Sequence, residues 1–292
     1  FGTGNRQPVF AVKVKDVSAK PLKKDSVHYS FATDYIDMLD FNGEKDVELL
    51  NSPVEKTVVF SPNLSTFKNK TSLKGIIKTV VQSGFSDPDL PLFVFEKQLN
   101  LILKNKEVKA AEIEETILPE NDGFNRLYVS FDVNRLDDYK SLNLPVSMFA
   151  PEKNDGSNAL VICPTDIPDV YSEVVYLEKP ISFVHGEGVK AFVSPNAENI
   201  PALERVSVER ADMIACFNCL RRRMGKPFEN GTAFIKEIET GIDKYTLLFA
   251  LEVFLELGIF TVSNGLFKEN AGLKNPLTNS SVYNKISEFK AN

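Results

Sequence analysis

The sequence predicts a multidomain α/β plus β protein: a small N-terminal β-barrel, a central small α/β domain and a C-terminal helical unit. Three observations support this division. Alternating apolar residues dominate the first part, short continuous apolar runs follow, and helical periodicity closes the chain. A chain of 292 residues also buries its apolar side chains better in two or three domains than in a single core. The predicted segments are 1–85, 86–125, 126–205 and 206–292.

The first segment, residues 1–85, is typical of short strands. Residues 9–17 alternate at period two, and further apolar runs cover 27–32, 57–60 and 72–81. Prolines stand at the starts and ends of these runs, where a missing backbone N–H is tolerated. Several short strands with few helical stretches favour an OB-like barrel, whose open face binds single strands or sugars.

A helix is expected over residues 91–106, where apolar side chains recur at helical spacing behind the capping residues Asp87 and Asp89. A connector rich in glutamate follows it and ends near residue 125. Continuous apolar runs of four or five residues come next, as in the buried strands of a parallel or mixed sheet. These runs are 127–131, 159–163, 174–177 and 189–193.

The last segment is predicted to contain helices and one hairpin. A first helix is capped by Ser207, a short second helix covers 232–240, and Asp243 caps a third helix that is apolar nearly all round. The sequence of residues 263–265, Ser-Asn-Gly, predicts a β-hairpin, and a final helix is expected over 278–289. Three helices followed by a hairpin is the order of a winged-helix domain, so we expect a winged-helix-like unit.

The net charge of −6 argues at first against nucleic-acid binding. The charge is, however, unevenly distributed. Residues 86–205 carry 11 basic and 21 acidic side chains, whereas residues 1–85 carry 12 basic and 9 acidic ones. The barrel is therefore mildly basic, and the acidic middle is expected to act as a spacer or a protein-docking segment.

No catalytic residue, metal ligand or cofactor is predicted in this chain. The two histidines, His28 and His185, are interpreted as ordinary strand and loop residues, and the pair Cys216 and Cys219 lies in a predicted helix without a second cysteine pair. Three cysteines and the lack of a long apolar run favour a cytoplasmic protein without a membrane partner. Because the chain starts with Phe1, we expect it to be cut from something longer.

Binding chemistry is concentrated near the later strands of the barrel. Phe67 stands among small polar residues and beside Lys68 and Lys70, with Lys74 further along the strand. Lysines can follow the phosphates of a single strand while an aromatic ring stacks on a base, at about 1–3 kcal/mol per base. The alternative is a solvated hairpin whose phenylalanine is folded into the barrel.

A second cationic group closes the first helix of the last segment. It consists of Arg221, Arg222, Arg223 and Lys226. Cations at this position stabilise the helix dipole by themselves. The functional alternative is a binding site for an acidic peptide or for phosphates, since guanidinium groups suit carboxylates.

The opening sequence FGTGNRQPVF, residues 1–10, resembles the FGxGNxxPxF element that leads into the OB domain of RecJ-type single-stranded-DNA exonucleases. Residues 64–73 resemble a later OB hairpin of that family, from whose usual pattern Thr66 and Lys70 depart. Residues 251–258 and 275–283 resemble the VFxELG and LTxSxxY segments of the C-terminal domain in the Gram-positive branch.

The resemblance implies the C-terminal half of a RecJ-like hydrolase that acts in DNA repair and recombination. Such enzymes degrade single strands from 5′ to 3′ with Mn or Mg ions, which are held by motifs upstream of the FGxGN element. This chain lacks an Asp-His-His sequence, so the nuclease core would be a missing N-terminal partner.

The resemblance also implies partners and site residues. Single-stranded DNA would bind Asn5 and Arg6 together with the residues around Phe67, and the acidic tail of single-strand-binding protein would contact the arginine run. Two alternatives remain open: a structural and protein-interaction segment that packs on the nuclease core without contacting DNA, and a free-standing enzyme with a site in the α/β domain.

Overall fold

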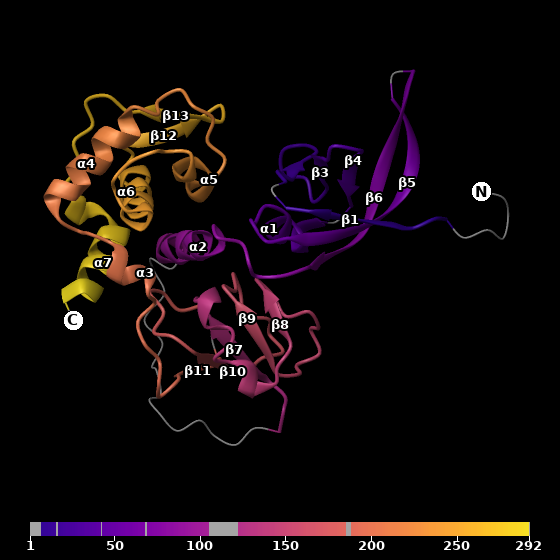
Figure 1. Ribbon diagram of the computed structural model, residues 1–292, viewed down its shortest axis with the longest axis horizontal. Coiled ribbons are helices and arrows are strands. Elements are labelled where there is room, and N and C mark those ends of the chain that lie inside the picture. The colour runs from indigo at the N-terminus through magenta and orange to yellow at the C-terminus, as the bar shows by residue number, and fades with distance from the viewer. Residues whose placement is uncertain are drawn as a thin grey trace. The chain divides into compact units, whose positions relative to one another are not determined.

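The computed structural model describes residues 7–15, 17–41, 43–67, 69–104, 122–184 and 188–291, with the side chain of Phe67 left out. The chain forms two compact units, Phe1–Leu90 and Pro91–Asn292, which are described separately (Figure 1). The predicted mixture of a β domain and an α/β domain is confirmed at this level. The finer division into four segments stays a prediction.

Unit 1 is built on a six-stranded sheet with the order β1-β5-β6-β4-β3-β2. Its pairs are antiparallel except for β4 and β6, which run parallel. The elements are β1 (Phe10–Val14), β2 (Lys20–Pro21), β3 (Tyr29–Ala32), β4 (Asp37–Asp40), a 3₁₀ turn at Gly43–Lys45, α1 (Val47–Leu50), β5 (Lys56–Phe67) and β6 (Lys70–Gln82). Four strands overlap the predicted alternating and apolar runs. The two-residue β2 was not predicted, and neither was β4, whose two apolar residues stand between aspartates.

The core of unit 1 lies between its strands and α1. Met38, Leu50 and Val58 are fully buried and pack with Phe31 and Ile77. Burial of these alternating side chains is what turns a period-two sequence into a strand of fixed register. The sheet therefore holds the long β5–β6 pair on a rigid base.

Unit 2 contains a five-stranded sheet with the order β11-β10-β7-β9-β8. All its described pairs are parallel, in agreement with the predicted parallel or mixed sheet. The elements are α2 (Leu90–Lys104), β7 (Arg126–Ser130), 3₁₀ turns at Val133–Arg135 and Lys140–Leu142, β8 (Val146–Met148), β9 (Ala159–Ile162), β10 (Glu173–Tyr176) and β11 (Lys190–Val193). The three-residue β8 was not predicted.

From α4 onward, the C-terminal part of unit 2 follows the predicted order of three helices and a hairpin, and the short helix α3, which precedes them, was not predicted. Its elements are α3 (Ala202–Arg205), α4 (Arg210–Arg221), α5 (Gly231–Lys236), α6 (Lys244–Glu256), β12 (Phe260–Ser263), β13 (Leu266–Glu269), a 3₁₀ turn at Leu277–Asn279 and α7 (Ser281–Ala291). The hairpin turn places Asn264 and Gly265 at φ values of 54° and 72°, as an Asn-Gly turn requires. Membership of the winged-helix class stays a prediction.

Of two predicted helix caps, one agrees with the structure and one differs, and the last helix begins three residues later than predicted. Asp243 caps α6 by accepting a hydrogen bond from the backbone N–H of Tyr245 at 2.8 Å, as predicted. The cap predicted at Ser207 is wrong, because α4 begins after Glu209; the Ser207 hydroxyl accepts from the Glu209 N–H at 3.2 Å instead. The last helix begins at Ser281, where the Glu256 carboxylate accepts backbone N–H groups of the first turn.

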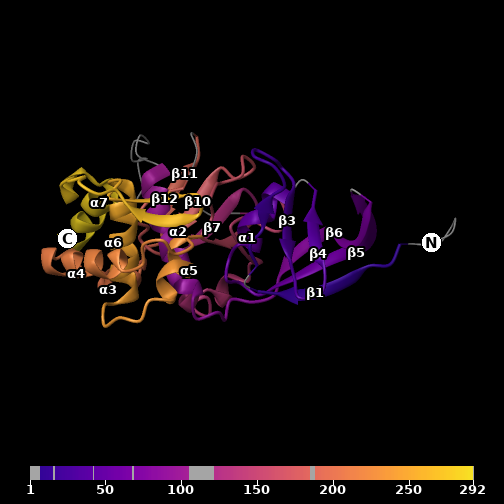
Figure 2. The same cartoon turned by 90° about the horizontal axis from the view of Figure 1, so that it is seen from above.

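Helix α2 ties the sheet of unit 2 to the C-terminal helices (Figure 2). The Gln98 side-chain oxygen accepts a hydrogen bond from the backbone of Ile181, which follows β10. The Glu96 carboxylate accepts the N–H groups of Gly231 and Thr232 at the start of α5, both at 2.8 Å. Among the described residues, no helix is long and apolar enough to cross a membrane.

Candidate nucleic-acid interface

Strands β5 and β6 extend beyond their other partners. β1 pairs with β5 only as far as Phe60, and β4 pairs with β6 only from Lys74 to Ile76. Within the described strands, residues 63–67 of β5 therefore pair only with residues 70–74 of β6. We call residues 63–73 the arm; in Figure 1 it is the far end of the β5–β6 ribbon.

The turn of the arm fixes which residues face one another. Asn69 adopts a left-handed conformation with φ of 60°, which asparagine tolerates better than most residues. Phe67 is then opposite Lys70 in the register, and the hydroxyls of Thr66 and Thr71 lie 3.0 Å apart. An aromatic residue and a lysine of the predicted site are thus brought to paired positions.

The arm has a polar face and an apolar face, because side chains alternate along each strand. Lys70, Ser72 and Lys74 occupy alternate positions of β6, and Ser65 and Asn63 lie opposite the last two. A polar face on which a serine stands between two lysines can contact a phosphate backbone, with the lysines near phosphates and the hydroxyls donating hydrogen bonds.

The other face of the arm carries a cross-strand pair of leucines. Leu64 and Leu73 are directly opposed, and their side chains are 71% and 53% exposed. Two leucines in direct contact with water can lie against an apolar partner or against the flat face of a base. This pair was not predicted as part of a site.

The two described lysines of the predicted site differ in their charge environment. Lys74 forms an ion pair with Asp37, its neighbour on β4, so its charge is locally neutralised. Lys70 is exposed and has no ion pair within the described part of the chain. Three other predicted residues, Asn5, Arg6 and Lys68, lie outside the described residues.

Tyr35 is a candidate that the sequence interpretation missed. It is 86% exposed in the turn between β3 and β4, two residues before the Asp37–Lys74 pair. The Thr33 hydroxyl holds this turn by accepting the N–H groups of Tyr35 and Ile36. An exposed ring near the base of the arm can stack on a base. Its signal in the sequence was an aromatic residue inside a polar turn.

The arginine run at the end of α4 is partly occupied by internal ion pairs. Arg221 bonds to Glu269 at 2.8 Å, and Arg223 bonds to Glu237 at 2.7 Å. Arg222 is exposed, and so is Lys226. The structure therefore brings two of the four predicted cations, Arg221 and Arg223, into ion pairs of the C-terminal part, whereas Arg222 and Lys226 form no ion pair among the described residues.

The described residues contain no group of three or more His, Cys, Asp or Glu side chains that could hold a metal ion. Burial raises the pKa of the Cys216 thiol to about 12, which keeps it protonated and unreactive at neutral pH. The His28 ring packs edge-on against Phe41, with ring centroids 5.3 Å apart. His185 lies outside the described residues.

Comparison with known proteins relates unit 1 to one family. The family model of the RecJ OB domain matches residues 1–79. A comparison with curated proteins found no match. Two solved structures similar to this chain are RecJ from Thermus thermophilus in complex with Mg²⁺ and with Mn²⁺, at 16% and 15% identity and TM-scores of 0.24 and 0.23. They cover 87% of this chain, which spans 33% and 32% of theirs, about a third of their length.

Proposed function

We propose, from the match of residues 1–79 to the family model of the RecJ OB domain, that unit 1 binds single-stranded DNA for a 5′-to-3′ exonuclease core. The observation that carries this proposal is the arm. It combines an exposed lysine, a paired aromatic position and hydroxyls on strands held by a folded sheet. In this proposal the catalytic Mn or Mg ions belong to the core and not to this chain.

The charge of the arm sets the expected strength of binding. Lys74 is neutralised by Asp37, so Lys70 is the unpaired cation among the described lysines of the predicted site. Few phosphates can be neutralised by so few cations, and affinity for single strands follows that number. We therefore expect weak binding by this chain alone, which the core would strengthen.

The first prediction concerns these lysines. The full chain with Lys68→Ala and Lys70→Ala should bind a fluorescein-labelled oligo-dT at least about fivefold more weakly than the unaltered chain, because two phosphate contacts are lost. Fluorescence anisotropy measures the change. Lys24→Ala is the matched control, since it removes an exposed lysine next to β2, at the far edge of the sheet from β5. If Lys24→Ala weakened oligo-dT binding as much as the double variant does, binding would depend on net charge and not on the arm.

A second candidate function is favoured by the exposed leucine pair of the arm. Leu64 and Leu73 form an apolar surface of the kind that packs against another protein domain. In this alternative, unit 1 is a structural segment that docks on the nuclease core without contacting DNA. The double variant Leu64→Ser, Leu73→Ser would then no longer associate with the nuclease core. Oligo-dT would bind neither the unaltered chain nor the lysine and leucine variants, so its anisotropy would stay at the value of the free oligonucleotide.

We also propose that the exposed cations after α4 bind an acidic peptide, such as the tail of single-strand-binding protein. Arg222 and Lys226 are the exposed members of the run that form no ion pair among the described residues, whereas the exposed Arg221 is paired with Glu269. Arg222→Ala with Lys226→Ala should remove binding of a labelled acidic peptide, whereas Lys274→Ala, an exposed cation after the hairpin, should not. Retained binding in the double variant would contradict the assignment.

A further inference from the structure

The sheet of unit 2 has a topological switch point between β7 and β10. After β7 the chain continues to β8 at one edge of the sheet. After β10 it continues to β11 at the opposite edge. In open parallel sheets, ligands bind outside the carboxyl ends of strands at such a point. Asp132 and Asn134 follow β7 here, and Glu178 follows β10.

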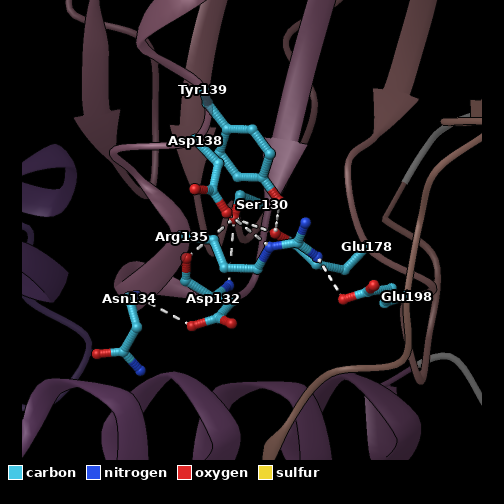
Figure 3. Close-up of polar contacts among 8 residues, drawn as sticks. All are labelled: Ser130, Asp132, Asn134, Arg135, Asp138, Tyr139, Glu178 and Glu198. Atoms are coloured by element: carbon cyan, nitrogen blue, oxygen red, sulfur yellow. Dashed lines mark hydrogen bonds and ion pairs between the residues drawn. The ribbon is translucent and has the colours of Figure 1, made fainter.

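A buried hydrogen-bond network shapes the backbone at this point (Figure 3). Glu178 is 1% exposed, and its carboxylate accepts the Ser130 hydroxyl at 2.7 Å, the Phe131 N–H at 2.9 Å and the Tyr139 hydroxyl at 2.6 Å. Burial raises the pKa of Glu178, and the three donors oppose that rise. These bonds saturate Glu178, so its role is to hold the segment that carries Asp132.

A cavity of about 110 Å³ opens beside this segment. Its floor is apolar and partly aromatic, and its polar groups are the Asp132 carboxylate, Asn134, Arg205 and the Tyr245 hydroxyl. The lining residues are Pro91, Phe95, Phe131, Asp132, Val133, Asn134, Ile200, Pro201, Ala202, Arg205 and Tyr245.

The polar groups of the cavity are only partly used by the protein. Asp132 is 6% exposed, and one of its oxygens accepts the Asn134 N–H at 3.0 Å, while no cation pairs with it among the described residues. Tyr245 is 9% exposed, and its phenolic oxygen has no hydrogen-bond partner in the described part of the chain. An acceptor and a donor, both largely buried, therefore line the cavity.

Arg205 lies at the rim. Its guanidinium stacks on the Tyr245 ring at 4.3 Å and donates two hydrogen bonds to Asp243, at 3.0 and 2.8 Å. Since a guanidinium has five N–H donors, three remain for a ligand. The cavity thus offers an apolar slot, a carboxylate acceptor, a phenol and a cation at its mouth.

We propose that this cavity binds a cytosine nucleotide, with the base in the slot and the phosphate at Arg205. A cavity of roughly 150 Å³ holds a benzene ring, so a cavity of about 110 Å³ with an open mouth admits at most one six-membered ring and excludes a two-ring purine. Carboxylates accept from the exocyclic amine of cytosine, and a phenol can donate to a ring nitrogen or carbonyl. This ligand is independent of the arm, and the inference goes beyond the proposed function.

The carboxylate gives the site a preference that can be measured. Thymine presents a carbonyl oxygen where cytosine presents its amine, so it would meet Asp132 with two acceptors facing each other. Discrimination by one such contact is worth roughly tenfold in affinity. The same chemistry is offered by a free nucleotide and by the terminal base of a strand.

The test is isothermal titration calorimetry of the full chain with dCMP, dTMP, inorganic phosphate and trinucleotides ending in dC or dT. We expect cytosine to bind about tenfold more tightly than thymine, either as the free nucleotide or at the strand end, and phosphate to bind far more weakly. A preference among the mononucleotides identifies the ligand as a free nucleotide. A preference among the trinucleotides alone identifies it as the terminal base of a strand.

Two substitutions make the assignment falsifiable without loss of the fold. Asp132→Asn can keep the oxygen that accepts from Asn134 while offering an amide donor, so the preference should shift towards dTMP. Tyr245→Phe keeps the ring and should weaken dCMP binding. Asp137→Asn, an exposed neighbour that does not line the cavity, is the control. Equal affinity for cytosine and thymine in both the mononucleotides and the trinucleotides, or an unchanged preference in Asp132→Asn, would overturn the proposal.

Discussion

At the scale of single residues, buried polar groups are placed where backbone groups need partners. Lys56 is fully buried, and its ammonium donates to the carbonyls of Leu50 and Ser52 at 2.8 and 2.6 Å. These carbonyls lie at and just beyond the end of α1, where the last C=O groups have no partner in the helix. A lysine at the start of a strand therefore completes the end of a helix.

This contact leads to a prediction for stability. Lys56→Met keeps the apolar stem but leaves buried carbonyls unsatisfied, so the free energy of unfolding should fall by about 1–3 kcal/mol. Urea denaturation followed by circular dichroism measures it. Lys13→Met, at an exposed lysine of β1, should change stability by less than about 1 kcal/mol. If the two variants were equally stable, the Lys56 contacts would carry no net stabilisation.

The sequence could not reveal residue-scale sites that depend on distant contacts. Asp132 and Tyr245 are far apart in the chain, and neither shows a motif, so only folding brings them to one cavity. Phe67 and Lys70 could be predicted as neighbours because a two-residue turn joins them. Local chemistry is readable from sequence, whereas a site built by packing is not.

At the scale of elements, α2, α5 and α6 meet around two buried carboxylates. Glu96 accepts the first N–H groups of α5, and Glu252 of α6 lies close by, since a Cβ on Gly231 would approach both side chains. Burial, with a further contribution from Glu96, raises the pKa of Glu252 to about 8. Glu252 is therefore protonated at neutral pH in the folded protein.

The raised pKa predicts how stability depends on pH. The ordinary pKa is 4.5, so the contribution of Glu252 is fully present below about pH 4.5 and is lost as the pH rises to about 8, at about 1.4 kcal/mol per pH unit. Glu252→Gln should remove this dependence and stabilise the protein at pH 8. Denaturation at pH 5, 6.5 and 8 tests the slope, with the exposed Glu229→Gln as control. An unchanged slope in Glu252→Gln would contradict the assignment.

Elements with strong periodicity were predicted, and short ones were not. Helix α6 is buried on nearly all sides and is readable from its apolar sequence. β2 and β8 have two and three residues, too few for a period to appear. The start of α4 differs from the predicted cap because Ser207 bonds to Asp212 and to the Glu209 N–H without itself becoming the cap.

At the scale of the whole molecule, the net charge hides the difference between the units. The total of −6 is set by residues 86–205, whereas residues 1–85 have more basic than acidic side chains. The family match of residues 1–79 falls on this basic part. The acidic α/β domain would disfavour a long phosphate backbone away from the Arg205 cavity, so we propose that it docks proteins or a single nucleotide while unit 1 holds the strand.

The central claim is that unit 1 binds single-stranded DNA through cations of the arm, and its most direct test is the salt dependence of oligo-dT binding. For single strands, each neutralised phosphate contributes about −0.7 to the slope of log K against log salt. We predict a negative slope for the full chain that becomes less steep by about 0.7 in Lys70→Ala. Absent binding, or a slope that is zero or identical in Lys70→Ala and the unaltered chain, would contradict the claim.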